Sequence, residues 1–219
     1  MKHILITGAN RGIGFELSKQ LFQKGYDVLA ACRKSSEPLK RTSIPIFEGL
    51  DLTDPRGFES LSNRISGKPL DLLINNAGIL LPDNLETIDF EEVETQFLVN
   101  ALGPIRLTRH LLPKMKDGSK IVFITSRMGS IGDNSSGGYY GYRMSKAALN
   151  AGAVSLARDL AQRHISIAIL HPGMVATEMT GRQGIPVSEA ASGLIRQIET
   201  WDLSKSGQFY HQNGEHLPW

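Results

Sequence analysis

A cluster of glycines stands between the first apolar run of the chain and its first helical pattern. Residues 4–7 read Ile-Leu-Ile-Thr, then Gly-Ala-Asn-Arg-Gly-Ile-Gly, and apolar side chains recur at helical spacing over residues 13–24. Glycine tolerates positive φ and close backbone approach, and the N-terminus of a helix attracts anions. A tight turn would also use glycines, but this context predicts the phosphate loop of a dinucleotide site. Its expected contacts are Gly8, Asn10, Arg11, Gly12, Ile13 and Gly14.

Short apolar runs alternate with longer helical patterns along the whole chain. Strands joined in this way pair in parallel through right-handed crossovers, and nearly all-apolar strands indicate burial on both faces. We therefore predict one α/β domain over residues 1–219, a Rossmann-type, doubly wound parallel sheet of about seven strands with helices on both faces. The expected strands are residues 4–6, 28–32, 46–47, 70–74, 120–125, 165–170 and 207–210. The expected helices are residues 13–24, 55–65, 90–114, 143–163 and 188–201.

Composition excludes several classes of function. The chain has 24 Lys and Arg against 22 Asp and Glu, and its net charge of +2 is too small to indicate a nucleic-acid partner. No stretch approaches the roughly 20 apolar residues that a membrane-spanning helix needs. Cys32 is the only cysteine, which favours a reducing, cytoplasmic location. We expect a small-molecule substrate as the partner, with no nucleic acid, no membrane and no metal site.

The end of the second predicted strand distinguishes the two nicotinamide cofactors. An NAD site is expected to carry an acid there, about 20 residues past the glycines, to bind the ribose 2′-hydroxyl. This strand ends in Arg33, and Asp27 lies at its opposite end. A guanidinium can fork onto a 2′-phosphate, and Arg11 in the glycine loop could add a second cation. Both arginines could instead be solvated surface charges, but their positions favour NADP(H).

Tyr142 and Lys146 are four residues apart in a segment rich in helix-forming residues. On a helix, this spacing places both side chains on one face. A tyrosine has a pKa of roughly 10, and a neighbouring ammonium favours the phenolate, so we expect a lowered pKa and a general acid and base at Tyr142. The same spacing occurs by chance in other proteins. Tyr139 and Tyr140 have no lysine four residues on and are expected to shape the pocket or to pack.

Motifs in a fixed order over nearly the whole chain resemble those of the short-chain dehydrogenase/reductase family. They are Thr7 with the glycine loop, Asn75-Asn76-Ala77-Gly78, Asn100, Ser126, Tyr142 with Lys146, and Pro172-Gly173. The resemblance implies an NADP(H)-dependent oxidoreductase in which Tyr142 exchanges a proton with the substrate oxygen while the nicotinamide carries the hydride. It also implies that Ser126 hydrogen-bonds that oxygen, that Lys146 holds the nicotinamide ribose, and that Asn100 supports a water leading to solvent.

The resemblance assigns further residues to the cofactor. Expected contacts are Asp51 with Leu52 beside the adenine, Asn75, Asn76, Ala77 and Gly78 along the adenosine and ribose, Tyr142 and Lys146, and Pro172, Gly173, Val175 and Thr177 near the nicotinamide and a phosphate. Asp51 could instead cap a helix, and residues 75–78 could form a plain turn. His171 is expected to be structural.

Within the family, the chain resembles the small carbonyl reductases, a subgroup that includes sniffer and C-factor, most visibly at residues 134–150, 206–209 and 217–219. This likeness implies ketones, aldehydes or quinones as substrates. Few residues lie between Thr177 and the last predicted helix, so a small or open pocket is expected. The loop of residues 127–141 is longer than the family usually shows, so the rim of the site is expected to be individual to this protein.

Alternatives to a dehydrogenase remain open. An NADP(H)-binding sensor with vestigial catalysis would have no need for Asn100, Ser126, Tyr142 and Lys146 as a set. A sugar-nucleotide epimerase would normally need a larger C-terminal region. In this family, the helices expected at residues 90–114 and after residue 143 commonly pair across a two-fold axis, so both a homodimer and a monomer are compatible with the sequence.

Overall fold

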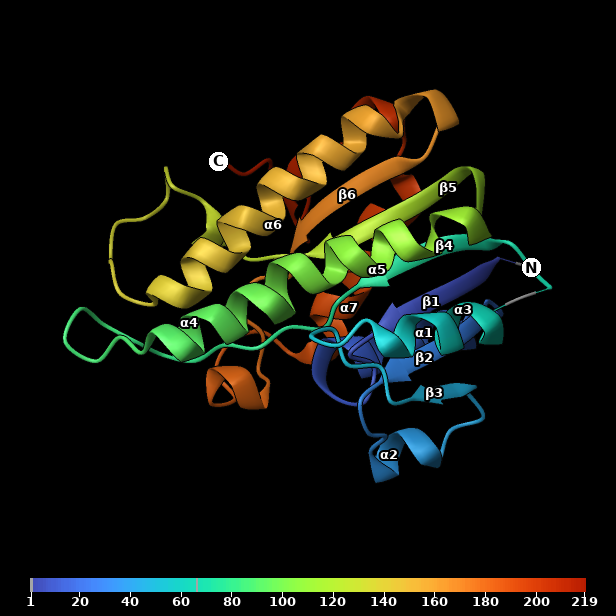
Figure 1. Ribbon diagram of the computed structural model, residues 1–219, viewed down its shortest axis with the longest axis horizontal. Helices are drawn as coiled ribbons and strands as arrows, with labels where there is room; N and C mark the ends of the chain where they lie inside the picture. Colours follow the sequence, from blue (N-terminus) through green and yellow to red (C-terminus); the bar gives the residue numbers. More distant parts are fainter. Residues whose placement is uncertain (1, 66) are drawn as a thin grey trace.

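The structure, a computed structural model, describes residues 2–65 and 67–219 and contains a seven-stranded parallel sheet in the order β3-β2-β1-β4-β5-β6-β7 (Figure 1). The strands are β1 His3–Thr7, β2 Asp27–Cys32, β3 Ile46–Glu48, β4 Leu70–Asn75, β5 Met115–Ile124, β6 Ser166–His171 and β7 Phe209–His211. The helices are α1 Gly12–Gln23, α2 Glu37–Lys40, α3 Arg56–Arg64, α4 Phe90–Phe97, α5 Gly103–Leu111, α6 Tyr140–Asp159 and α7 Val187–Thr200. The predicted doubly wound sheet is confirmed.

Helices cover both faces of the sheet, and each face has its own apolar layer (Figure 1). On one face, α1 and α7 pack over Ile4 and Ile6 of β1. On the other face, α3, α5 and α6 pack over Leu5. Successive strand residues point to opposite faces, so all five residues of β1 are buried between the two layers. This burial accounts for the nearly continuous apolar sequence of the central strands.

Parallel pairing brings the carboxyl ends of the strands to one edge of the sheet. Thr7 at the end of β1 pairs with Ala31 of β2, and Asn75 at the end of β4 pairs with Phe123 of β5. The loops that follow β1, β2, β4, β5 and β6 therefore leave the sheet at this edge. In open α/β sheets, ligands bind in the crevice outside these carboxyl ends.

The segment predicted as one helix over residues 90–114 is divided in the structure. α4 continues into a π-helical turn, Leu98–Leu102, then into α5 and a 3-10 turn, Leu112–Lys114. Pro104 lies in the first turn of α5 and has no N–H to donate to the carbonyl of Asn100, so the regular hydrogen-bond ladder is interrupted at this point. The interruption gives Asn100 a local geometry that a regular helix would not have.

Other element boundaries also differ from the prediction. β5 begins at Met115, five residues before the expected start, and α6 begins at Tyr140 rather than at residue 143. The four-residue helix α2 is too short to produce a periodic pattern and was not predicted. In the part of the chain that the structure describes, no helix is both long and apolar enough to cross a membrane.

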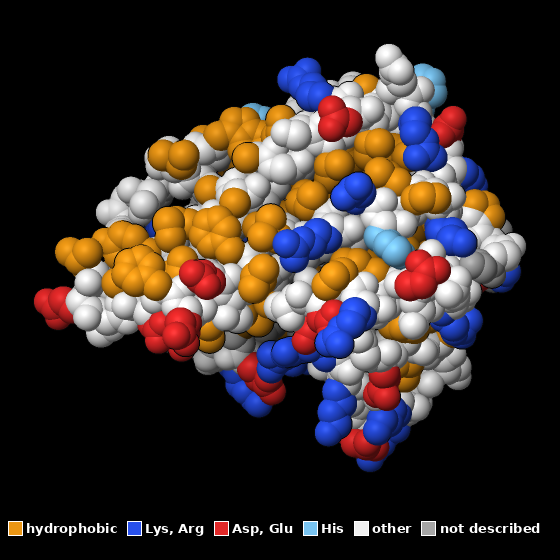
Figure 2. Space-filling model, viewed as in Figure 1, with side chains coloured by type: hydrophobic (Ala, Val, Ile, Leu, Met, Phe, Trp, Pro, Cys, Tyr) orange, Lys and Arg blue, Asp and Glu red, His pale blue; other side chains and the backbone are white. Residues whose placement is uncertain are grey.

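Apolar side chains gather on the outer surface over α4 and α6 (Figure 2). Exposed apolar residues of this helical region include Phe90, Leu102, Tyr140 and Met144. These helices belong to the segments through which a homodimer is predicted, and the oligomeric state stays a prediction.

Candidate active site

The glycine-rich loop after β1 forms a close-packed cradle at the carboxyl edge of the sheet. Gly8 has a φ of +64°, and a Cβ on it would lie 2.7 Å from the Cα of Ala77. A Cβ on Gly14 would lie 2.4 Å from the carbonyl oxygen of Gly8, so backbone would have to move to admit a side chain at either glycine. α1 begins at Gly12 with no side-chain cap and no acid in its first turn. The cradle therefore fits a pyrophosphate, which would meet uncapped N–H groups.

Hydrogen bonds join this loop to the segments after β2 and β4. The hydroxyl of Thr7 accepts from the N–H groups of Asn76 and Ala77, both at 3.1 Å. The amide nitrogen of Asn76 donates to the carbonyl of Thr7 at 3.0 Å. The hydroxyl of Ser36, after β2, donates to the carbonyl of Asn10 at 2.6 Å. Three loops from separate parts of the sequence are thus held as one surface.

Several residues predicted to contact the cofactor direct their side chains elsewhere. The amide of Asn75 donates to the hydroxyl of Thr108 in α5 at 3.2 Å. Leu52 is buried in the core, and Ile13 packs against the apolar layer of the opposite face. The carboxylate of Asp51 accepts from the N–H of Thr53 at 2.8 Å. Asn75, Leu52 and Ile13 could therefore contact a cofactor at this edge through their backbone groups and not through these side chains.

The two arginines predicted to bind a 2′-phosphate differ in their surroundings. The guanidinium of Arg11 forms an ion pair with Glu178, in the segment after β6. Arg33 directly follows β2, and its side chain is exposed. Among the ion pairs of residues 2–65 and 67–219, none involves Arg33. Arg33 therefore has no carboxylate partner within the described chain.

Ser126, Tyr142 and Lys146 are buried together at the end of β5. The hydroxyl of Ser126 lies near enough to that of Tyr142 to lower the pKa of the tyrosine, and the Nζ of Lys146 lies 5.8 Å from the centroid of the Tyr142 ring. The same Nζ donates to the carbonyl of Ile124 at 3.1 Å. A Cβ on Gly78 would lie 3.5 Å from it, so the segment after β4 meets the lysine directly. The end of β5, the segment after β4 and α6 thus meet around the ammonium of Lys146.

Burial shifts the pKa of both partners in this pair. Desolvation raises the pKa of Tyr142 to about 12, and the nearby hydroxyl of Ser126 acts in the opposite direction. Desolvation lowers the pKa of Lys146 to about 8. The expected lowering of the tyrosine pKa is therefore wrong for this structure, because the cost of burying a phenolate outweighs the effect of Ser126. Tyr142 is protonated at neutral pH, the state that a general acid requires.

Asn100 lies in the π-helical turn and is fully buried. Its amide nitrogen donates to the carbonyl of Ile79 at 2.9 Å and to the hydroxyl of Ser145 at 3.0 Å. Its Oδ1 accepts from the N–H of Ile79 at 2.8 Å, which leaves one lone pair. A Cβ on Gly78 would lie 3.2 Å from this oxygen. Asn100 thus fastens the segment after β4 to α6 and keeps an acceptor near Lys146.

The segment after β6 closes the edge on the side of the glycine loop. Pro172 and Val175 are buried, and Gly173 has a φ of +86°. A Cβ on Gly12 would lie 3.4 Å from the Cγ2 of Thr177, so the two segments are in contact. These four predicted residues therefore lie along the same edge as the phosphate cradle.

His171, at the end of β6, has the environment of a structural residue. Burial lowers its pKa to about 3, and His211, Arg127 and Lys146 act in the same direction. Its ring packs edge-on against that of His211, with 5.1 Å between centroids. The neutral imidazole agrees with the expectation that His171 is not a catalytic base.

The start of α6 depends on Asp83, which sequence reasoning missed. Tyr139 precedes the helix with a φ of +54°, and its N–H donates to the carbonyl of Asp83 at 2.8 Å. The carboxylate of Asp83 accepts from the N–H of Tyr140 and, at 3.0 Å, from that of Gly141. A capping residue is recognisable in sequence when it immediately precedes its helix. Asp83 caps from 57 residues away, so it left no local signal.

Gln96 is a second residue that supports the site and that sequence reasoning missed, although the sequence contained a pattern that indicates its role. It is fully buried, and its side-chain amide exchanges hydrogen bonds with the backbone of Leu81 at 3.0 and 3.4 Å. Gln96 and Asn100 are four residues apart, so both fall on one helical face. A polar pair on a face that packs inward indicates hydrogen bonding to a neighbouring segment.

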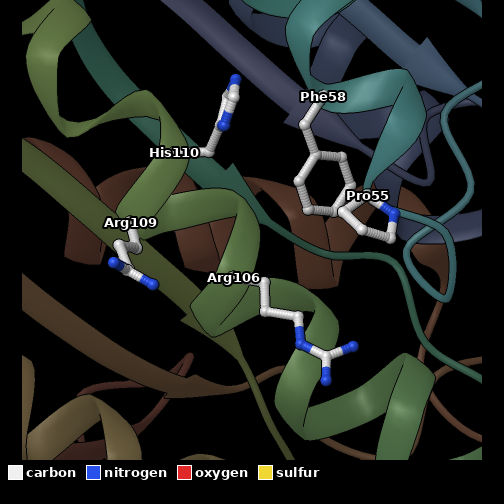
Figure 3. Close-up of a pocket in the computed structure, with 5 residues that line it drawn as sticks. All are labelled: Pro55, Phe58, Arg106, Arg109 and His110. Atoms are coloured by element: carbon white, nitrogen blue, oxygen red, sulfur yellow. The ribbon is translucent and has the colours of Figure 1, made fainter.

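Outside this edge, the described surface offers a pocket but no metal centre. A pocket of about 550 Å³ between α3 and α5 is lined by Pro55, Phe58, Arg106, Arg109 and His110 (Figure 3). None of these five belongs to the predicted catalytic or cofactor residues. Across the described residues, no group of three or more His, Cys, Asp or Glu side chains could hold a metal ion.

Comparison with known proteins gives consistent matches over the chain. A family model described as short chain dehydrogenase matches residues 2–185. The 1-hydroxy-2-glutathionyl-2-methyl-3-butene dehydrogenase of Rhodococcus sp. (strain AD45) is 38% identical over 226 aligned positions, which cover 100% of both chains. The carbonyl reductase Sniffer of D. melanogaster superimposes with a TM-score of 0.93 at 30% identity, covering 100% of both chains. The NADPH-bound carbonyl reductase from chicken fatty liver has a TM-score of 0.92 at 29% identity, covering 100% of this chain and 99% of its own.

Proposed function

The chain belongs to the short-chain dehydrogenase/reductase family, and on this premise we propose that it transfers a hydride between NADP(H) and a carbonyl or alcohol substrate. Reduction of ketones, aldehydes or quinones is the proposed direction. One observation carries the proposal: the buried group of Ser126, Tyr142 and Lys146 lies at the same sheet edge as the glycine cradle. A protein that only bound the nucleotide would have no need to bury a tyrosine and a lysine beside it.

The residues of the edge are suited to NADP(H). Gly8, Gly12 and Gly14 with the N-terminus of α1 would hold the pyrophosphate, and Arg33 would pair with the 2′-phosphate. The carbonyl reductase from chicken fatty liver, 29% identical, is described with NADPH bound, which supports this choice of cofactor. We assign the adenosine side to Asp51, Leu52, Asn75, Asn76, Ala77 and Gly78, and the nicotinamide side to Pro172, Gly173, Val175 and Thr177. When bound, NADPH supplies the hydride that reduces the carbonyl carbon.

The proton of the reaction is handled by the chain itself. As negative charge develops on the carbonyl oxygen, the hydroxyl of Tyr142 donates its proton to it, and the hydroxyl of Ser126 supplies a second hydrogen bond. The ammonium of Lys146 stabilises the tyrosinate that remains, because the attraction between opposite charges is strong in a buried site. In the oxidative direction, the same tyrosinate takes the proton of the alcohol.

Proton return to Tyr142 requires a path from solvent. We assign Asn100 to this path, because the free lone pair of its Oδ1 lies next to Gly78 and hence near Lys146. A water held there would connect the lysine to the outside.

We expect kcat/KM for NADPH, measured in the reductive direction, to fall as pH rises above about 8, because this parameter reports groups of the free enzyme. Reduction needs a protonated Tyr142 and a charged Lys146. Burial raises the pKa of Tyr142 to about 12, so the first condition holds across the range. Burial lowers the pKa of Lys146 to about 8, so the second condition is lost through that pH. Initial rates from about pH 6 to about pH 10 measure the profile, and a flat profile would contradict these roles.

Oxidation of NADPH in the presence of a substrate panel tests the proposed activity. The panel contains aromatic ketones, quinones, aldehydes and steroids. For the oxidative direction, it includes a glutathione-conjugated alcohol, because the relative that is 38% identical is named for such a compound. We expect turnover of at least one carbonyl compound. Tight NADPH binding with no turnover across the panel would instead support a sensor of NADP(H).

A further inference from the structure

The loop of residues 127–139 leads from Ser126 to α6 and so lies beside Ser126 in the proposed site. Arg127, the first residue of this loop, is shared by two carboxylates. Its Nε lies 3.2 Å from the Oδ2 of Asp133 in the same loop, and its Nη2 lies 2.6 Å from the Oε1 of Glu215 near the end of the chain. One guanidinium therefore links both ends of the segment 127–133 to a distant part of the sequence.

A backbone contact forms a second link between the same two regions. The N–H of Gly132 donates to the carbonyl of Trp219 at 2.8 Å. A Cβ on Gly132 would lie 3.1 Å from that oxygen, so the approach is closer than most side chains would allow. The two links are independent, because one is an ion pair of side chains and the other is a hydrogen bond of the main chain.

The chain between the two acceptors, Glu215 and Trp219, is anchored in the core. Leu217 is fully buried, and its N–H donates to the carbonyl of Phe209 in β7 at 2.8 Å. The ring of Trp219 stacks on that of Phe209, with 5.6 Å between centroids and 22° between planes. The segment 127–133 is therefore fastened to a fixed part of the fold.

The same C-terminal region also supports the loop after β6. The N–H of Gln212 donates to the carbonyl of His171 at 2.8 Å. A Cβ on Gly173 would lie 3.2 Å from the Nε2 of His211. Residues 209–219, which we call the C-terminal brace, thus contact both the Ser126 side and the Gly173 side of the site.

The far end of the loop is held from another direction, and its middle is exposed. The Nε of Arg143 donates to the carbonyl of Gly138 at 3.0 Å, and Asp83 binds the backbone of residues 139–141. Between these anchors, residues 133–137 are exposed. Ile131 lies within the segment 127–133 and exposes 82% of its surface. An exposed apolar side chain therefore stands on backbone that is fixed at both ends.

We propose that Arg127 is a positioning residue for the carbonyl substrate, which holds the segment 127–133 against the C-terminal brace and thereby fixes the rim beside Ser126. This inference rests on the proposed function. The phosphate cradle is built from other contacts, among Thr7, Asn76, Asn10 and Ser36, so we expect NADPH binding not to depend on the ion pair between Arg127 and Glu215.

Two substitutions, Arg127→Gln and Glu215→Gln, test the inference. We expect KM for an accepted aromatic ketone to rise about fivefold in each, because a partly exposed ion pair holds a loop whose displacement misplaces the substrate. Both kcat and Kd for NADPH should stay within about twofold, and the double variant should be no worse than the worse single variant, since one link is broken in all three. Arg127→Lys should recover part of the loss.

Hydrogen exchange supplies a readout that needs no turnover. The amide of Gly132 should exchange about tenfold faster in Arg127→Gln, because the segment opens locally. The matched control is Arg106→Gln, an exposed arginine of α5, which should change neither KM nor exchange.

Wild-type KM and wild-type exchange at Gly132 in both variants would overturn the proposal, as would a loss of NADPH affinity in step with KM. If the wild-type chain reduced no carbonyl compound, the proposed function would fail while exchange at Gly132 would still decide whether Arg127 holds the rim.

Discussion

The Tyr142→Phe variant should lose about a thousandfold in kcat for carbonyl reduction while Kd for NADPH stays within about twofold of wild type. The change removes one hydroxyl, the group proposed to donate the proton, and leaves the buried ring in place. The variant should still fold, because losing the interaction of this hydroxyl with Ser126 costs only about 1 kcal/mol. Steady-state rates of NADPH oxidation and fluorescence titration with NADPH measure the two quantities.

The matched control for this substitution is Tyr140→Phe. Tyr140 is two residues away at the start of the same helix and has no lysine four residues on. It should keep wild-type turnover. Comparable turnover in Tyr142→Phe and wild type would contradict the assigned role of Tyr142.

The Arg33→Asp variant should lower the preference for NADPH over NADH, measured as the ratio of the two kcat/KM values, by about a hundredfold. Wild type presents an exposed arginine with no carboxylate partner among the described residues, directly after β2. An aspartate there would repel a 2′-phosphate and accept a hydrogen bond from a 2′-hydroxyl. Most of the effect should therefore appear as a loss of NADPH affinity.

Arg106→Asp serves as the control for the change of charge, because Arg106 is an exposed arginine on α5 that lines the pocket in Figure 3 and belongs to neither predicted set. Its ratio should equal that of wild type. Equal use of NADH and NADPH by wild type, or an unchanged ratio in Arg33→Asp, would contradict the assignment of Arg33.

Features that depend on local sequence could be predicted. The order of strands and helices, the glycine loop between β1 and α1, and the shared helical face of Tyr142 and Lys146 all follow from short-range patterns. Membership of the short-chain dehydrogenase/reductase family and the likeness to its small carbonyl reductases are confirmed. The roles of the individual site residues stay predictions.

Features that depend on contacts between distant segments could not be predicted. Asp83 caps α6 from 57 residues away, and Glu215 pairs with Arg127 from 88 residues away. The side chain of Asn75 donates a hydrogen bond to Thr108 in α5. This contact depends on which face of β4 packs against α5, and the local sequence does not determine that. The raised pKa of Tyr142 results from burial, and the spacing of Tyr142 and Lys146 in the sequence does not indicate how deeply they are buried.

Transfer of deuterium from NADPH labelled at both C4 positions to a carbonyl compound tests the central claim most directly. With a ketone or aldehyde found in the panel, the product alcohol should carry one deuterium on the former carbonyl carbon, seen by mass spectrometry, because the hydride passes directly from the nicotinamide. Product formed without deuterium, or oxidation of NADPH that leaves the carbonyl compound unchanged, would contradict hydride transfer between NADP(H) and this substrate class.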